Sequence, residues 1–308
     1  MSEEQRSLLI RGMGAFAAAL VVLLIVGTFA DYQIAQAIYA PSNPLVIFAS
    51  TLGLFPMAYP ACILLGVLTQ RSLASQKSQV LRIVGAVVCV ALALLFGALI
   101  TRAVLSKLEG FGGIVGFEPP RPVGMGIGAV IGAALCALGF KAGKANNAED
   151  LARRVVIVVV VLAVSFVAVE IVKPFMSRPR PRLLFAGHEG IEFCPWYRRF
   201  TDANKFMAAY GIEKDAFKSF PSGHSLQAAS VLAAFYGLSL VYPSLRQKLG
   251  IVLAVEIIFS LIVMVCRMIL GAHFLSDVSM GALVSVVSFL IIMALQKRQD
   301  QKSLASPK

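Results

Sequence analysis

Apolar runs of about twenty residues, long enough as helices to cross a hydrocarbon core roughly 30 Å thick, recur along nearly the whole sequence. Short polar segments separate them. Of the 308 residues, 58% are hydrophobic and only 14% are charged, whereas soluble domains carry about a quarter charged residues. The sequence therefore predicts an all-α fold, a polytopic bundle of transmembrane helices, in preference to several soluble domains.

Hydropathy along the chain predicts eight spans. They cover residues 10–30, 45–68, 83–104, 122–140, 155–172, 223–241, 249–268 and 278–295. The first run has no small-residue cleavage site of the usual kind, so we expect a retained span and not a removed signal peptide. In the fourth span, Gly124, Gly128 and Gly132 recur at four-residue spacing, which favours close packing within the chain over dimerisation.

Basic residues between the spans predict the orientation. Those that fall on one side are Arg6, Arg11, Arg71, Lys77, Arg82, Lys141, Lys144, Arg153, Arg154, Arg246, Lys248, Lys297 and Arg298. By the positive-inside rule this side is the cytoplasm, so both termini are expected there. The pattern and the compact loops are compatible with a bacterial inner membrane.

The segment 173–218 breaks this rule, because it is predicted outside and yet contains many basic residues. This favours a local use for positive charge, such as holding an anion, although long loops also translocate largely regardless of charge. The formal net charge of +12 could suggest nucleic acid. The basic residues form no continuous stripe, however, so we expect no nucleic-acid partner.

Three polar clusters lie at the outer ends of predicted spans, and the first is KPFMSRPRPR. It contains Lys173, Arg178, Arg180 and Arg182, and its prolines prevent the fifth span from continuing as a helix. Long cationic side chains on a stiff segment are suited to binding an oxyanion. A basic cluster beside a span is also typical of an interfacial anchor, and this alternative stays open for the cluster taken alone.

The second cluster, SFPSGHS, places Ser222, Gly223 and His224 at the start of the sixth span. Free backbone N–H groups and the helix dipole favour a bound anion there, and Gly223 allows a ligand to approach the backbone. The alternative is a simple helix cap without a ligand.

The third cluster, CRMILGAHFLSD, contains Arg267, Gly271, His273 and Asp277. The last two are four residues apart and share a helix face. We expect the Asp277 carboxylate to accept the Nδ1 proton of His273, which leaves Nε2 as a nucleophile. An isolated His–Asp pair is more often structural than catalytic. His224 and His273 are two of only three histidines in the chain, which favours a shared site.

Together the clusters resemble the type 2 phosphatidic acid phosphatase superfamily, whose motifs are K-x6-R-P, P-S-G-H and S-R-x5-H-x3-D. The matching residues are Lys173, Arg180 and Pro181, then Pro221, Ser222, Gly223 and His224, then Arg267, His273 and Asp277. Cys266 stands where the family pattern has Ser. The resemblance implies a six-helix phosphatase core at 81–298 with an outer active-site loop at 173–221. Two additional spans at 1–80 precede it, and a polar cytoplasmic tail at 299–308 follows.

The resemblance also implies a mechanism. His273 attacks phosphorus and forms a phosphohistidine, Asp277 orients its ring, and His224 protonates the leaving oxygen. The residues implied to bind the phosphate oxygens are Lys173, Arg180, Ser222, Gly223 and Arg267. This scheme is metal-independent and requires no cofactor.

Some residues around these motifs have secondary roles in this interpretation. Arg178 and Arg182 are further phosphate candidates. Glu170 is expected to pair with Lys173 on one helix face, and Glu256 to be a protonated or hydrogen-bonded packing group. The remaining histidine, His188, lies in the outer loop, where a non-catalytic role is expected.

The expected substrate is an amphiphile whose phosphate meets the basic cluster while its tail stays in lipid. The resemblance implies a range of lipid phosphates, among them undecaprenyl diphosphate and phosphatidic acid, with the active site facing the periplasm or the outside. Two alternatives stay open: a phosphotransferase of the same fold that passes phosphate to another lipid, and a non-enzymatic transporter or scaffold that binds anions. Oligomeric state is not indicated.

Overall fold

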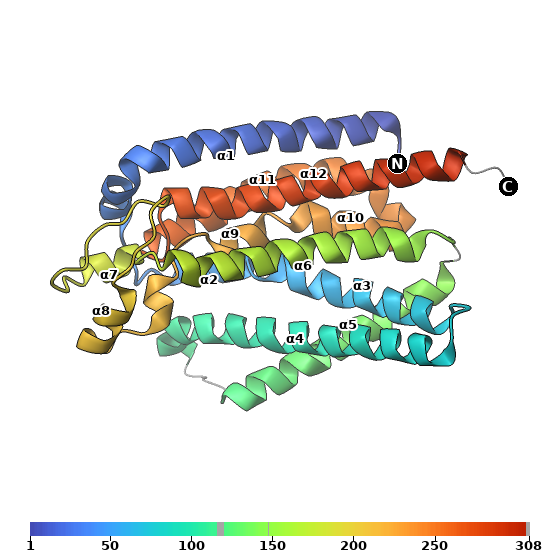
Figure 1. The fold of residues 1–308 in the computed structure, drawn as a ribbon, viewed down its shortest axis with the longest axis horizontal. Coiled ribbons are helices and arrows are strands. Elements are labelled where there is room, and N and C mark those ends of the chain that lie inside the picture. The colour runs from blue at the N-terminus through green and yellow to red at the C-terminus, as the bar shows by residue number, and fades with distance from the viewer. Residues whose placement is uncertain (116–119, 147, 306–308) are drawn as a thin grey trace.

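The computed structural model describes residues 1–115, 120–146 and 148–305, which form helices and loops without a strand (Figure 1). The helices are α1 Glu3–Ile38, α2 Pro44–Leu52, α3 Phe55–Leu73, α4 Gln79–Val115, α5 Arg121–Ala145, α6 Leu151–Met176, α7 Pro181–Phe185, α8 Ala203–Tyr210, α9 Gly223–Ala228, α10 Val231–Val241, α11 Leu249–Ile269 and α12 Leu275–Ala305. Short 3₁₀ helices, η1 Lys214–Phe217 and η2 Pro243–Lys248, lie in connections. Eight segments are long and apolar enough to cross a membrane. The predicted all-α, multi-pass bundle is confirmed.

Two spans that hydropathy predicts as continuous are broken in the structure. The second consists of α2 and α3, and the sixth consists of α9 and α10, which are separated at Ser230. Hydropathy does not reveal these breaks, because both halves of each span are apolar. The buried Glu256 carboxylate of α11 accepts the Leu232 N–H at the start of α10. Glu256 is therefore a hydrogen-bonded packing group, as expected, and it supports the break.

The N-terminal helices are built into the bundle. Helix α1 lies along α12, and α3 packs against α4, α5, α6 and α10 (Figure 1). The start of α1 and the C-terminal part of α12 lie at one end of the bundle, whereas α7 and α8 lie at the opposite end. The segment between α6 and α9 and the two ends of the described chain are therefore at opposite ends of the bundle, as the even number of spans requires.

Small residues allow α5 to approach its neighbours closely. A Cβ atom at Gly128 would lie 2.7 Å from Thr101 Cβ of α4, and one at Gly132 would lie 3.2 Å from the Ala93 carbonyl carbon. On another side, a Cβ atom at Gly66 of α3 would lie 2.8 Å from the backbone carbon of Cys136 in α5. The glycine spacing thus serves packing within the chain, as predicted.

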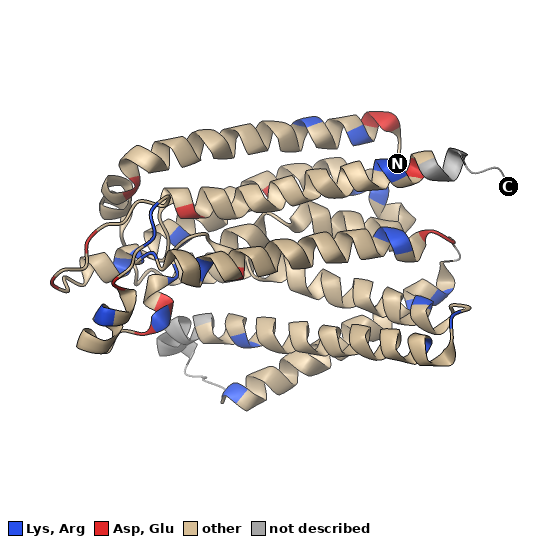
Figure 2. Ribbon diagram, viewed as in Figure 1, with Lys and Arg blue, Asp and Glu red and all other residues tan. Residues whose placement is uncertain are grey.

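Charged residues join three helices at the end that carries the termini (Figure 2). Asp300 of α12 forms ion pairs with Arg6 of α1 and with Arg154 of α6, the latter at 2.5 Å between Oδ1 and Nη2. A polar tail was predicted from residue 299, but α12 continues to Ala305, and these arginines hold Asp300 within it. Residues 306–308 of that predicted tail lie outside the described residues.

Candidate active site

The three polar clusters meet at the end of the bundle that carries α7 and α8. A Cβ atom at Gly223, the first residue of α9, would lie 2.7 Å from Lys173 Nζ at the end of α6. His273 Nδ1 lies 2.6 Å from the carbonyl oxygen of Ser219, just before α9. Arg180 Nη1 lies 3.5 Å from the carbonyl oxygen of Ala272. The convergence that the sequence predicts therefore occurs.

His273 is 2% exposed and lies in the turn between α11 and α12. Gly271 makes that turn with a φ of 58°, a conformation that favours glycine. Because a carbonyl oxygen only accepts hydrogen bonds, the Ser219 contact places the ring proton on Nδ1 and leaves the Nε2 lone pair available. The imidazole thus has the tautomer that a nitrogen nucleophile needs.

The predicted partner of that Nδ1 proton was Asp277, and the structure corrects this. Asp277 Oδ2 lies 3.9 Å from His273 Nδ1, too far for a hydrogen bond. The same oxygen accepts the Phe274 N–H at 2.8 Å and the Ser219 hydroxyl at 2.5 Å. Asp277 reaches back to the start of its own helix, as the third residue of a capping box does. It therefore holds Ser219, whose carbonyl in turn holds His273.

The surroundings of His273 favour the neutral ring. Burial lowers its pKa well below the ordinary value of 6.5, and the positive charges of Arg180 and Arg267 lower it further. His224 and Lys173 act in the same direction. The imidazole is thus an uncharged base at neutral pH, in a site rich in positive charge.

The cations around His273 have different partners. Lys173 forms an ion pair with Glu170, as predicted. Arg180 donates from Nε and Nη2 to the backbone oxygen and to Oδ1 of Asp215, at 2.8 and 3.0 Å. Arg267 is 3% exposed, and its Nε has no hydrogen-bond partner within the described ranges. A buried guanidinium with an unsatisfied donor is suited to an incoming anion.

Asp215 was not predicted as part of the site. It pairs with Arg180 and also with Arg182, whose Nη2 lies 3.4 Å from Asp215 Oδ2. Its side chain is 51% exposed, and it lies in η1, between α8 and α9. No motif or helical spacing relates it to the arginines, so the sequence gives no signal for this contact.

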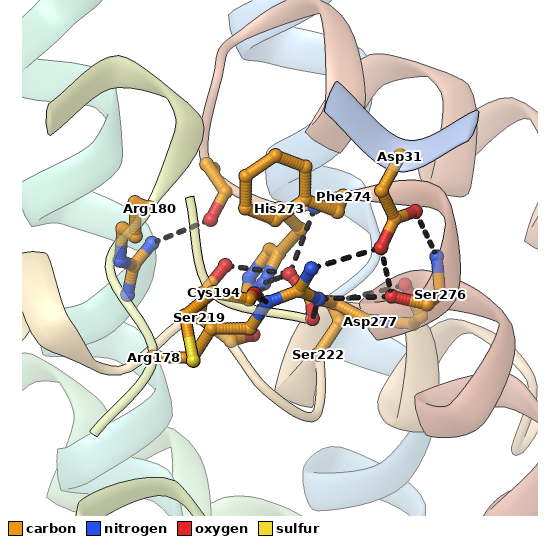
Figure 3. Close-up of polar contacts among 12 residues, drawn as sticks. Asp31, Arg178, Arg180, Cys194, Ser219, Ser222, His273, Phe274, Ser276 and Asp277 are labelled. Atoms are coloured by element: carbon orange, nitrogen blue, oxygen red, sulfur yellow. Dashed lines mark hydrogen bonds and ion pairs between the residues drawn. The ribbon is translucent and has the colours of Figure 1, made fainter. Parts of the chain in front are cut away.

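Arg178 is a second correction, because it cannot be a phosphate ligand in this geometry. Its side chain is fully buried, and its contacts are drawn in Figure 3. Nη1 donates to Asp277 Oδ1 at 2.5 Å, Nη2 to Asp31 Oδ2 at 2.9 Å, and Nε to the Cys194 carbonyl at 2.7 Å. The guanidinium also lies 4.2 Å from the centroid of the Phe274 ring. Arg178 therefore holds Asp277 in place and does not face the phosphate site.

Asp31 was also missed, since it directly follows the first predicted span, residues 10–30. The structure places it inside α1, which continues to Ile38, and leaves it 2% exposed. An acidic residue at the end of an apolar run was the available signal, because such a charge inside a membrane protein usually has a partner.

Ser222 caps α9. Its hydroxyl oxygen accepts from Ser225 N at 3.3 Å and Ser225 Oγ at 3.0 Å, and its N–H donates to the Asp277 carbonyl at 3.0 Å. A Cβ atom at Gly281 of α12 would lie 3.0 Å from the Ser222 carbonyl carbon. This glycine lets α12 close onto the P-S-G-H segment.

An apolar cavity of about 410 Å³ adjoins the polar cluster. Helices α3, α4, α6 and α9 form its walls, with side chains such as Leu99 and Phe166. Lys173, Gly223 and His224 form its polar end. The cavity thus connects Lys173 with the apolar side chains of these helices. Within the described ranges, no three His, Cys, Asp or Glu residues are grouped to hold a metal ion.

Comparison with known proteins adds one positive result. No curated protein and no solved structure gives a significant match. Residues 154–301, from α6 to α12, match the family model described as PAP2 superfamily, whose members are generally phosphatases. All three motifs lie in this range. The match supports a phosphatase-type fold for residues 154–301, and it confirms the resemblance that the three motifs indicated.

Proposed function

We propose that the protein is a membrane lipid phosphate phosphatase that acts through a phosphohistidine. One observation carries this proposal: the apolar cavity ends at Lys173 and His224, beside the buried His273 and its arginines. Its volume of about 410 Å³ is within the range of roughly 300 to 1,000 Å³ that is usual for small-molecule sites. A lipid tail in the cavity would bring its phosphate to the cations.

In the proposed first step, Nε2 of His273 attacks phosphorus, and the bond from phosphorus to the lipid oxygen breaks. His224 gives its proton to that leaving oxygen. The new phosphohistidine ring keeps its Nδ1 proton and becomes cationic. The Ser219 carbonyl at 2.6 Å and the Asp277 carboxylate at 3.9 Å favour that charge.

In the second step, water attacks phosphorus and the bond to Nε2 breaks, while His224 accepts a proton from the water. Inorganic phosphate leaves and the neutral His273 ring returns. The phosphate oxygens are bound in both steps by Lys173, Arg180 and Arg267, together with the Ser222 hydroxyl and the Gly223 N–H. These groups supply the positive charge and donors that the transition state needs, so the reaction requires no metal.

The same proposal includes the orientation. Lys and Arg recur in the chain ends and in the short connections at the end with the termini, and in short loops such residues mark the cytoplasmic side by the positive-inside rule. The active site then faces the outside or the periplasm. Undecaprenyl diphosphate and phosphatidic acid are the first substrates to test, because each joins a phosphate group to a long apolar chain.

The test is phosphate release by detergent-purified protein in the presence of EDTA, with both lipids. We expect release by wild type, none by His273→Ala, and full release by His188→Ala. His188 is a matched control, because its ring packs on Tyr210 in the outer segment, with centroids 4.9 Å apart. Recovery of the phosphate on a second lipid instead of in water would identify a phosphotransferase. Equal rates for wild type and His273→Ala would refute the proposal.

A further inference from the structure

We propose that Asp31 of α1 is a positioning residue for His273, acting through Arg178 and Asp277. Asp31 lies outside the residues that match the family model, in the first of the two N-terminal spans. The inference rests on the proposed role of His273 as nucleophile. It gives the first span a function, namely to complete the support of the active site.

Asp31 is held in one orientation by the start of α12. Oδ1 accepts the Ser276 N–H at 2.9 Å, and Oδ2 accepts Nη2 of Arg178 at 2.9 Å and also the Ser276 hydroxyl (Figure 3). The residue is 2% exposed. Both carboxylate oxygens are therefore used as hydrogen-bond acceptors. No other side chain of the same shape has two acceptor oxygens.

Two further contacts bring α1 to this position. A Cβ atom at Gly27, one turn before Asp31, would lie 2.7 Å from the Ser276 nitrogen, so only glycine allows the helix to come this close. Trp196 of the outer segment donates from Nε1 to Thr28 Oγ1 at 2.9 Å. The outer segment and α12 thus both pack on the turn of α1 that precedes Asp31.

Arg178 transmits the position of Asp31 to the site. Its planar guanidinium binds Asp31 with one nitrogen, and Asp277 at 2.5 Å and Ser276 Oγ at 2.8 Å with another. Asp277 binds the Ser219 hydroxyl, and the Ser219 carbonyl binds His273 Nδ1. Each link is a buried hydrogen bond, so a shift at Asp31 moves the support of the imidazole.

The variant Asp31→Asn isolates this effect, because it keeps the shape and changes one acceptor into a donor. Whichever way the amide lies, its NH2 group faces a group that itself donates: the Ser276 N–H at one oxygen position, or Arg178 at the other. Asp300→Asn is the matched control. It removes a carboxylate that also joins α1 to α12, through Arg6, but at the opposite end of the bundle.

The first readout does not depend on activity. With only three histidines, ¹⁵N-histidine-labelled protein in micelles gives three imidazole spectra, and His273→Ala assigns one of them. We expect Asp31→Asn to move the His273 nitrogen signals and Asp300→Asn to leave them unchanged. An unchanged His273 spectrum in Asp31→Asn, or equal changes in both variants, would overturn the inference.

The second readout is kinetic. We expect Asp31→Asn to lower kcat by up to about 100-fold, the cost of misplacing a reacting group by about 1 Å, with KM little changed. Asp300→Asn is expected to keep the wild-type kcat. If wild type is active, His273→Ala is inactive and Asp31→Asn matches wild type, the inference fails and the proposed function stands. If wild type releases no phosphate, the proposed function fails, and the imidazole spectra still decide the inference.

Discussion

Replacement of Arg178 by leucine tests the assignment of this residue to support rather than to phosphate binding. The change removes the cation that pairs with two buried carboxylates, those of Asp31 and Asp277, whose side chains are 1% and 0% exposed. Breaking a buried ion pair by removing one partner costs about 3–5 kcal/mol, because the other charge remains buried and uncompensated. We therefore expect a loss of that size in the free energy of unfolding.

The matched control is Arg182→Leu in the same basic segment. Arg182 is 41% exposed and has one ion pair, at 3.4 Å, so we expect a loss below about 1 kcal/mol. The assay is unfolding by SDS titration in mixed micelles, with circular dichroism as the signal. If Arg178→Leu loses no more stability than Arg182→Leu and only raises KM for the lipid phosphate, Arg178 is a phosphate ligand and the structural assignment is wrong.

Three further predictions concern the site itself. Since burial and nearby arginines lower the His273 pKa below 6.5, a ¹⁵N NMR titration should show its ring still neutral at pH 6.5, and a midpoint above that value would contradict the structure. Ala58→Phe, which narrows the apolar cavity, should reduce kcat/KM about tenfold for long-chain substrates and leave short-chain phosphate esters unaffected, as loss of roughly two buried methylene groups predicts. Equal losses for both substrate classes would argue against a tail in the cavity. Asp215→Asn should lower the inhibition constant of inorganic phosphate about two- to fivefold, because the substitution removes a carboxylate that competes with phosphate for Arg180. A higher inhibition constant would mean that Asp215 instead orders the arginine.

The sequence was sufficient to predict the eight spans and the meeting of the three motifs. Span length and apolar composition follow directly from the thickness of the membrane. The location of Lys173, Ser222 and His273 at one end of the bundle follows from the alternation of spans, since each cluster adjoins a span end on the same side. The length and composition of a span are local features, and the side on which each span ends follows from alternation. Both can be recognised without knowledge of tertiary contacts.

The support of the site could not be predicted, because it depends on contacts between distant residues. Asp31 and Arg178 are 147 positions apart, and nothing in their spacing relates them. Asp277 and His273 do share a helix face, and the expected hydrogen bond was wrong because Asp277 caps its own helix instead. Arg178 and Arg180 are two residues apart in the sequence, yet one is behind the site and the other faces it.

The central claim is that phosphate passes through His273, and rapid-quench labelling tests it most directly. Protein is mixed with lipid phosphate carrying ³²P and quenched within milliseconds. The account predicts an acid-labile, base-stable phosphate on the chain that is lost in His273→Ala and maps to the peptide containing His273. Steady phosphate release without any label on that peptide would contradict it.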